Sequence, residues 1–158
     1  AITDARISIV ENENFSLRQE SRVNAIYRGV MCLIALRGAK DFRADDSIKF
    51  HTLEDHHIFP KAYLAKRKGR DGKPISSEQI NSIVNRTLIA DKTNGKISKS
   101  SPADYLEKLV PADRKDKIMA SHFIDDDALD AMKMNDFDSF MGAREKALLA
   151  EMARRLVG

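Results

Sequence analysis

The sequence contains a single cysteine, Cys32, among its 158 residues. One cysteine excludes a disulfide within the chain and a zinc site built on a pair of cysteines. Cys32 lies in the apolar run 29–36, where we expect it to be a small buried hydrophobic side chain. This sparse use of cysteine fits a cytoplasmic protein.

Long hydrophobic runs are also missing. No apolar stretch approaches the roughly 18 residues that cross a bilayer, so we expect no membrane contact. We see no basic segment followed by an apolar one at the N-terminus, and therefore expect no secretory leader. The chain begins at Ala1 rather than Met, from which we expect it to be the C-terminal part of a longer protein. Its 42% apolar and 32% charged residues are typical of a globular domain with a hydrophobic core.

Basic charge is concentrated in the middle of the chain. Residues 61–99 hold ten lysines and arginines against three acidic residues, although the whole chain has a net charge of only +3. Such a block attracts the phosphates of nucleic acids, although a solvated loop has the same composition. Much of this charge lies in 67–74, where Gly69, Gly72 and Pro74 predict an exposed loop.

The two ends of the sequence have the spacing of amphipathic helices. Apolar residues recur every three or four positions over 22–36 and 136–156, and a further helix is predicted over 112–120. Ser101-Pro102-Ala103-Asp104 is a typical helix start, with serine at the N-cap and proline at the first helical position. The acidic run 125–127 indicates another helix start, because acids interact favourably with the helix dipole there.

The middle part has a different pattern. Segments 48–53 and 83–89 are predicted to be short strands, and 61–64 a helical turn. Asp91 is predicted to cap a short helix that carries Asn94. The expected order is therefore helix, then strand, loop, strand and helix, then further helices.

Two adjacent histidines stand in this middle part. Glu54-Asp55-His56-His57-Ile58-Phe59-Pro60 is followed by Asn85-Arg86-Thr87-Leu88, Lys92-Thr93-Asn94-Gly95-Lys96 and Ser101-Pro102-Ala103-Asp104-Tyr105-Leu106. This series resembles the HNH (ββα-metal) nucleases. It is most similar to the HNH module that ends GmrSD-type and SspE-type bacterial restriction proteins, beside a ParB-like nucleotidase half. The motifs cover residues 54–106, about a third of the chain.

The resemblance implies an α+β, mostly helical fold. At its centre we expect a ββα-metal HNH unit of two short antiparallel strands and a helix, flanked by N- and C-terminal helices. The chain would be a single HNH nuclease domain over 1–158, with a helical wing 1–46, a core 47–109 and a second wing 110–158. In the full-length protein it would follow a ParB-like nucleotidase or sensor domain.

The resemblance also implies residue roles. His57 aligns with the general base, and His56 and Asn94 align with the two metal ligands. Asn85 aligns with the middle asparagine, which mostly orders the loop and strand and which we count with His57 among the catalytic candidates. Neighbouring acids and cations complete the site: Glu54 and Asp55 as residues that orient a histidine, and Lys61, Lys66, Arg67, Lys68, Arg70, Lys73, Lys96 and Lys99 as contacts to the substrate backbone.

Elementary chemistry supports these roles independently. A neutral imidazole accepts a proton from water near neutral pH, and a divalent cation polarises a phosphate and steadies the leaving 3′ oxygen. One imidazole and one amide oxygen leave most coordination positions to water and phosphate. This suits Mg²⁺ or Mn²⁺, with Co²⁺ or Ni²⁺ as further candidates. Because consecutive strand residues face opposite sides, we expect His56 and His57 at a strand end or a bulge.

The sequence therefore predicts a metal-dependent endonuclease that nicks or cleaves DNA, in bacterial defence against phage or foreign DNA. RNA stays open as a substrate. One alternative is a non-cleaving nucleic-acid-binding or regulatory module of a larger restriction protein. A second is a closed structural metal site made of His51, His56, His57 and His122.

Overall fold

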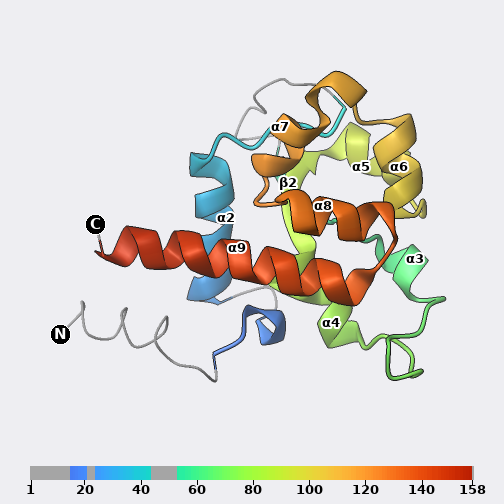
Figure 1. Ribbon diagram of the computed structural model, residues 1–158, viewed down its shortest axis with the longest axis horizontal. Coiled ribbons are helices and arrows are strands. Elements are labelled where there is room, and N and C mark those ends of the chain that lie inside the picture. Colours follow the sequence, from blue (N-terminus) through green and yellow to red (C-terminus); the bar gives the residue numbers. More distant parts are fainter. Residues whose placement is uncertain (1–14, 21–23, 44–52, 158) are drawn as a thin grey trace.

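Helices surround a small two-stranded antiparallel sheet, which confirms the predicted α+β, mostly helical fold (Figure 1). The computed structural model describes residues 15–20, 24–43 and 53–157. The N-terminal part consists of the 3-10 helix η1 (Leu17–Gln19) and helix α2 (Ala25–Leu36). The C-terminal part consists of α6 (Pro102–Lys108), the 3-10 helix η4 (Ala112–Arg114), α7 (Lys115–Ala120), α8 (Asp126–Lys133) and α9 (Phe137–Val157).

The middle unit follows the predicted order of strand, loop, strand and helix. Its elements are β1 (Leu53–His57), α3 (Lys61–Leu64), α4 (Ser77–Asn81), the 3-10 helix η3 (Ile83–Asn85), β2 (Arg86–Ala90) and α5 (Asp91–Ile97). The strands pair residue by residue, from Leu53 opposite Ala90 to His57 opposite Arg86. The predicted strand 48–53 lies outside the described residues except for Leu53, where β1 begins.

Short capping interactions explain most helix boundaries. The side chains of Asn24, Ser101 and Asp125 each accept a backbone N–H at the start of α2, α6 and α8, as the sequence suggested for the last two. The prediction that 83–89 is a strand throughout is wrong at its start. There the hydroxyl of Ser82 accepts the N–H of Val84, and the chain closes the turn η3 instead.

The cap of α5 is also different from the prediction. Asp91 is the first residue of the helix and is exposed, so it does not cap it. Within the described residues no side chain caps the start of α5. The carboxylate of Asp41, from a distant part of the chain, instead accepts the N–H of Ala90 just before the helix at 3.1 Å and the side-chain hydroxyl of Thr93 at 2.6 Å. This contact attaches the end of the N-terminal part to the helix that carries Asn94.

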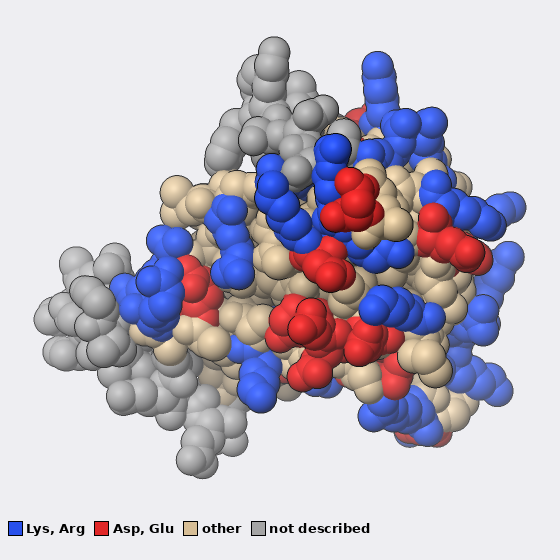
Figure 2. All heavy atoms as spheres, turned by 45° about the horizontal axis from the view of Figure 1, so that its top comes forward, with Lys and Arg blue, Asp and Glu red and all other residues tan. Residues whose placement is uncertain are grey.

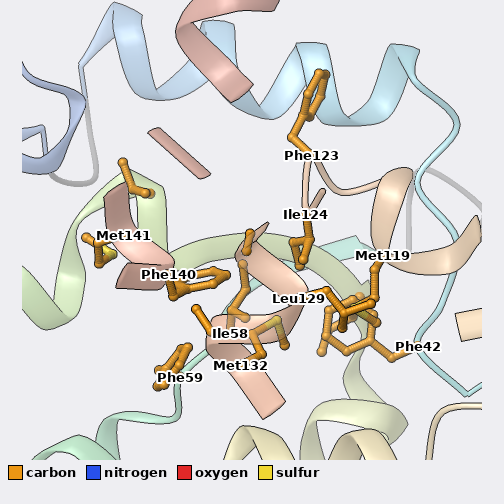
Figure 3. Close-up of a cluster of buried hydrophobic side chains, with 14 of the residues drawn as sticks. Phe42, Ile58, Phe59, Met119, Phe123, Ile124, Leu129, Met132, Phe140 and Met141 are labelled. Carbon is orange, nitrogen blue, oxygen red and sulfur yellow. The ribbon is translucent and has the colours of Figure 1, made fainter. Parts of the chain in front are cut away.

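The hydrophobic core lies between the sheet and the C-terminal helices (Figure 3). The ring of Phe59, just after β1, lies 5.3 Å from that of Phe137 and 5.0 Å from that of Phe140, both on α9. Ile58 and Met132 lie close by in the same cluster. The apolar stripe of α9 therefore packs in the core, as its helical spacing predicted.

Two buried polar side chains connect the C-terminal helices to β2. Arg144 of α9 is fully buried and donates to the carbonyl oxygens of Val84, Arg86 and His122 at distances of 2.5 to 3.1 Å. The Nε2 of His122 donates to the carbonyl oxygen of Lys40 at 2.6 Å, and its Nδ1 accepts the hydroxyl of Thr87 at 2.6 Å. These contacts fix the sheet against its helical cover.

The expectation for Cys32 is wrong, because its side chain is exposed. In the same helix the buried positions are Val30 and Ile34, so α2 turns Cys32 away from the core. No helix within the described residues is long and apolar enough to cross a bilayer.

Candidate active site

His57 is the last residue of β1, as expected for a histidine that must act at a strand end. The ladder continues without an inserted residue up to His57, so there is no bulge at the two histidines, and His56 and His57 face opposite sides of the sheet. Across the ladder, His57 lies beside Arg86, whereas His56 lies beside Thr87. His56 is buried, with 8% of its surface exposed, and His57 is half-buried.

A chain of polar contacts surrounds the His57 ring. Its Nε2 lies 3.0 Å from Oδ1 of Asn81 and 3.1 Å from Nη1 of Arg86. Arg86 is itself held by Asp55, whose Oδ2 lies 2.6 Å from both Nε and Nη2. The hydroxyl of Tyr27, on α2, donates to the same carboxylate oxygen. Asp55 thus reaches His57 through Arg86, and its role in orienting a histidine stays a prediction.

This environment favours the neutral form of the His57 imidazole. Burial is the largest influence and lowers the pKa of His57 below 6.5, whereas the hydrogen bond to Asn81 acts in the opposite direction. The positive charge of Arg86 lowers the pKa further, and Asp55 partly compensates for it. A neutral imidazole has a lone pair with which to accept a proton, as a general base requires.

The backbone just after His57 is held at four polar groups. Oδ1 of Asn85 accepts the N–H of Phe59 at 2.9 Å, and its Nδ2 donates to the carbonyl oxygen of Phe59 at 3.1 Å and to that of Ile80 at 3.0 Å. Ile58 donates its N–H to the backbone oxygen of Asn85, and its own oxygen accepts the hydroxyl of Tyr105. Asn85 is fully buried and its amide is engaged by backbone groups, which fits the loop-ordering role that the resemblance implied.

Replacing Asn85 by alanine is expected to lower the free energy of unfolding by about 3 kcal/mol, because it leaves three buried backbone groups without a partner. Urea titration monitored by circular dichroism measures this loss as a lower midpoint at unchanged slope. The matched control is Asn94→Ala, which changes the half-buried asparagine of α5 and is expected to cost about 1 kcal/mol or less. Equal losses in the two variants would contradict the loop-ordering role.

Asn94 lies on a helix that packs against both strands. Within the part of the chain that the structure describes, no group hydrogen-bonds with its side-chain amide. Its amide oxygen therefore has its lone pairs available for another ligand. The side chain of Glu54, the other acid expected to orient a histidine, lies outside the described part.

The alternative of a closed structural metal site fails at His122. Both ring nitrogens of His122 are engaged by Thr87 and Lys40, and burial lowers its pKa to about 3. Over 15–20, 24–43 and 53–157, no three His, Cys, Asp or Glu side chains gather closely enough to hold a metal ion. His51 lies outside the described residues.

The cations assigned to the substrate backbone are exposed, but they differ in their contacts. The guanidinium of Arg67 lies 4.7 Å above the ring of Tyr63. Arg70 pairs with Asp136 at 2.7 Å and donates to Ser139 at 2.6 Å, so it attaches the basic loop to the start of α9. On the face shown in Figure 2, lysines and arginines project along the margin while acids gather in the middle. Of the eight cations assigned to the substrate backbone, the six lysines are exposed and form no ion pair with the part of the chain that the structure describes: Lys61, Lys66, Lys68, Lys73, Lys96 and Lys99.

Sequence reasoning missed three residues that contact this site: Asn81, Arg86 as a partner of His57, and Tyr27. Arg86 stood inside a quoted motif, but only its charge was noted. Asn81 lies on α4, a helix of five residues that is too short to show apolar periodicity. Its capping box, Ser76 with Gln79, was the one local signal that indicates this helix.

Comparison with known proteins identifies the family. Residues 9–150 match the family described as GmrSD restriction endonucleases, C-terminal domain, and the chain belongs to this family. An uncharacterized protein of Methanocaldococcus jannaschii is 33% identical over 162 residues, covering 87% of this chain and 27% of that protein. The chain thus spans about a quarter of the length of this curated relative. No solved structure matches the chain.

Proposed function

We propose that this domain is a metal-dependent HNH endonuclease that nicks or cleaves DNA, in bacterial defence against phage or foreign DNA. The observation that carries the proposal is the half-buried His57 at the end of β1, adjacent to His56 and near the exposed Lys61, in surroundings that lower the pKa of its imidazole. Membership of a restriction-endonuclease family supports the same reaction class.

His57 acts as the general base. It accepts the proton of a water molecule whose oxygen attacks the phosphorus atom, while the bond from phosphorus to the 3′ oxygen breaks. The products are a 5′-phosphate and a 3′-hydroxyl, whose oxygen takes up a proton from solvent water. Lysines outside the two strands, including Lys61 and Lys96, hold the DNA backbone by charge and contribute little sequence preference.

His56 and Asn94 are the proposed metal ligands. The donor set fits a divalent ion, because one imidazole and one amide oxygen leave most coordination positions to water and phosphate. Mg²⁺ or Mn²⁺ suits this set best, with Co²⁺ or Ni²⁺ as further candidates. When bound, the ion supplies Lewis-acid stabilisation of the phosphate and the leaving oxygen.

The rest of the proposal concerns the full-length protein. Since the chain spans only part of its relative, the HNH domain would act together with a ParB-like nucleotidase or sensor domain that controls it. Such a protein would work in the cytoplasm, where invading DNA is found.

Incubation with supercoiled plasmid tests the proposal. With Mg²⁺ or Mn²⁺ we expect conversion to nicked or linear DNA, and with EDTA no conversion, because the phosphate then lacks its Lewis acid. RNA treated in parallel measures the choice of substrate. Salt-sensitive binding of plasmid without products in any metal would instead favour the non-cleaving binding module.

A further inference from the structure

The Nε2 atom of His57 has two neighbours of opposite hydrogen-bonding character. Oδ1 of Asn81, at 3.0 Å, only accepts, and Nη1 of Arg86, at 3.1 Å, only donates. A protonated Nε2 satisfies Asn81, whereas an unprotonated Nε2 satisfies Arg86. The choice decides which ring nitrogen carries the lone pair, and so which nitrogen serves as the base.

The amide of Asn81 is oriented by its own helix. Its Nδ2 donates to the hydroxyl of Ser77, one turn earlier in α4, at 3.1 Å. The capping box of Ser76 and Gln79 fixes the start of the same helix. Since the amide nitrogen is directed to Ser77, the amide oxygen is directed to His57.

Arg86, unlike Asn81, is charged and pairs with a carboxylate, that of Asp55. Its Nε and Nη2 both contact the carboxylate of Asp55 at 2.6 Å, and both side chains are largely buried. A guanidinium paired in this way is already stabilised by strong, charge-assisted hydrogen bonds. Asn81, by contrast, has only His57 recorded as a donor to its side-chain oxygen within the described residues.

We propose that Asn81 is a positioning residue that holds the His57 ring with its proton on Nε2 and its lone pair on Nδ1. Among the described residues, none bonds with Nδ1 of His57, so this nitrogen is open to a water molecule. The part of the inference that concerns catalysis rests on the proposed nuclease function: Nδ1 takes the proton of the attacking water. The tautomer itself is a property of the folded domain without substrate.

Nitrogen-15 NMR of the histidine-labelled, metal-free domain tests the tautomer. At pH 8 the imidazole is neutral, and long-range couplings show which ring nitrogen carries the proton. We expect Nε2 to be protonated in the wild type and a mixture of tautomers in Asn81→Ala. Asn81→Asp should restore the wild-type tautomer, because a carboxylate oxygen still accepts from Nε2. Glu78→Ala, on an exposed position of α4, is the matched control without effect.

Proton on Nδ1 in the wild type, or the same tautomer in Asn81→Ala as in the wild type, would overturn the proposal. In plasmid nicking we expect Asn81→Ala to lower kcat about tenfold with KM unchanged, the effect of one lost neutral hydrogen bond, and Asn81→Asp to recover most of it. The two proposals fail separately. A wild type that nicks no DNA overturns the nuclease, whereas an unaltered tautomer in Asn81→Ala overturns this one even where nicking persists.

Discussion

Replacing His57 by alanine is expected to lower the rate of metal-dependent plasmid nicking by about a thousandfold, within the range that a general base contributes. The reason is chemical and not structural. His57 is half-buried at the end of a strand, and the backbone that follows it is held by Asn85 and Tyr105. The rate is measured under single-turnover conditions with Mn²⁺ and excess enzyme, so that DNA binding does not limit it.

DNA affinity provides the control for this variant. The cations assigned to the backbone lie on other segments, so a mobility-shift titration of His57→Ala should give the wild-type affinity and salt dependence. Lys61→Ala should show the opposite pattern. It removes an exposed charge and should weaken DNA binding, while nicking at saturating enzyme continues. Cleavage by His57→Ala at the wild-type rate would exclude His57 as the base.

The largest stability effect is expected at Arg144. Arg144→Met should lower the free energy of unfolding by about 3 kcal/mol or more, because the carbonyl oxygens of Val84, Arg86 and His122 lose their donor inside the protein. Burial lowers the pKa of Arg144 to about 9, so the side chain stays charged at neutral pH and its hydrogen bonds are charge-assisted.

Urea denaturation of Arg144→Met and Arg144→Lys separates charge from geometry. Lysine keeps the charge but lacks the planar fork that reaches several carbonyl oxygens at once, so we expect it to recover only part of the loss. Arg155→Met, at an exposed position of the same helix, should change stability by about 0.5 kcal/mol or less. If Arg144→Met proved as stable as Arg155→Met, the hydrogen bonds of Arg144 between α9 and β2 would not contribute to the free energy of unfolding.

The sequence predicted those parts of the fold that depend on local signals. The serine cap of α6, the acidic start of α8 and the apolar stripe of α9 follow from residues close together in the chain. These patterns act over one or two turns of helix, which a sequence displays directly.

Contacts between distant segments were not predictable in this way. Asp41 holds the start of α5 through Ala90 and Thr93, and the network at His57 joins Tyr27 to Asp55. The predicted burial of Cys32 is wrong because α2 is apolar over most of its surface, and the sequence does not show which side of the helix meets the sheet. Tertiary packing decides which side chains of such a helix are buried, and local helix propensity does not predict this packing.

The position of a bound Mn²⁺ tests the central claim most directly. We would locate the ion by its anomalous scattering in a crystal of the domain with a short DNA duplex. We expect one ion coordinated by the His56 imidazole and the amide oxygen of Asn94, with a phosphate beside it at the end of β1, where His57 ends the strand. An ion bound elsewhere, or DNA cleaved with no ion at His56 and Asn94, would contradict the proposed metal-dependent centre.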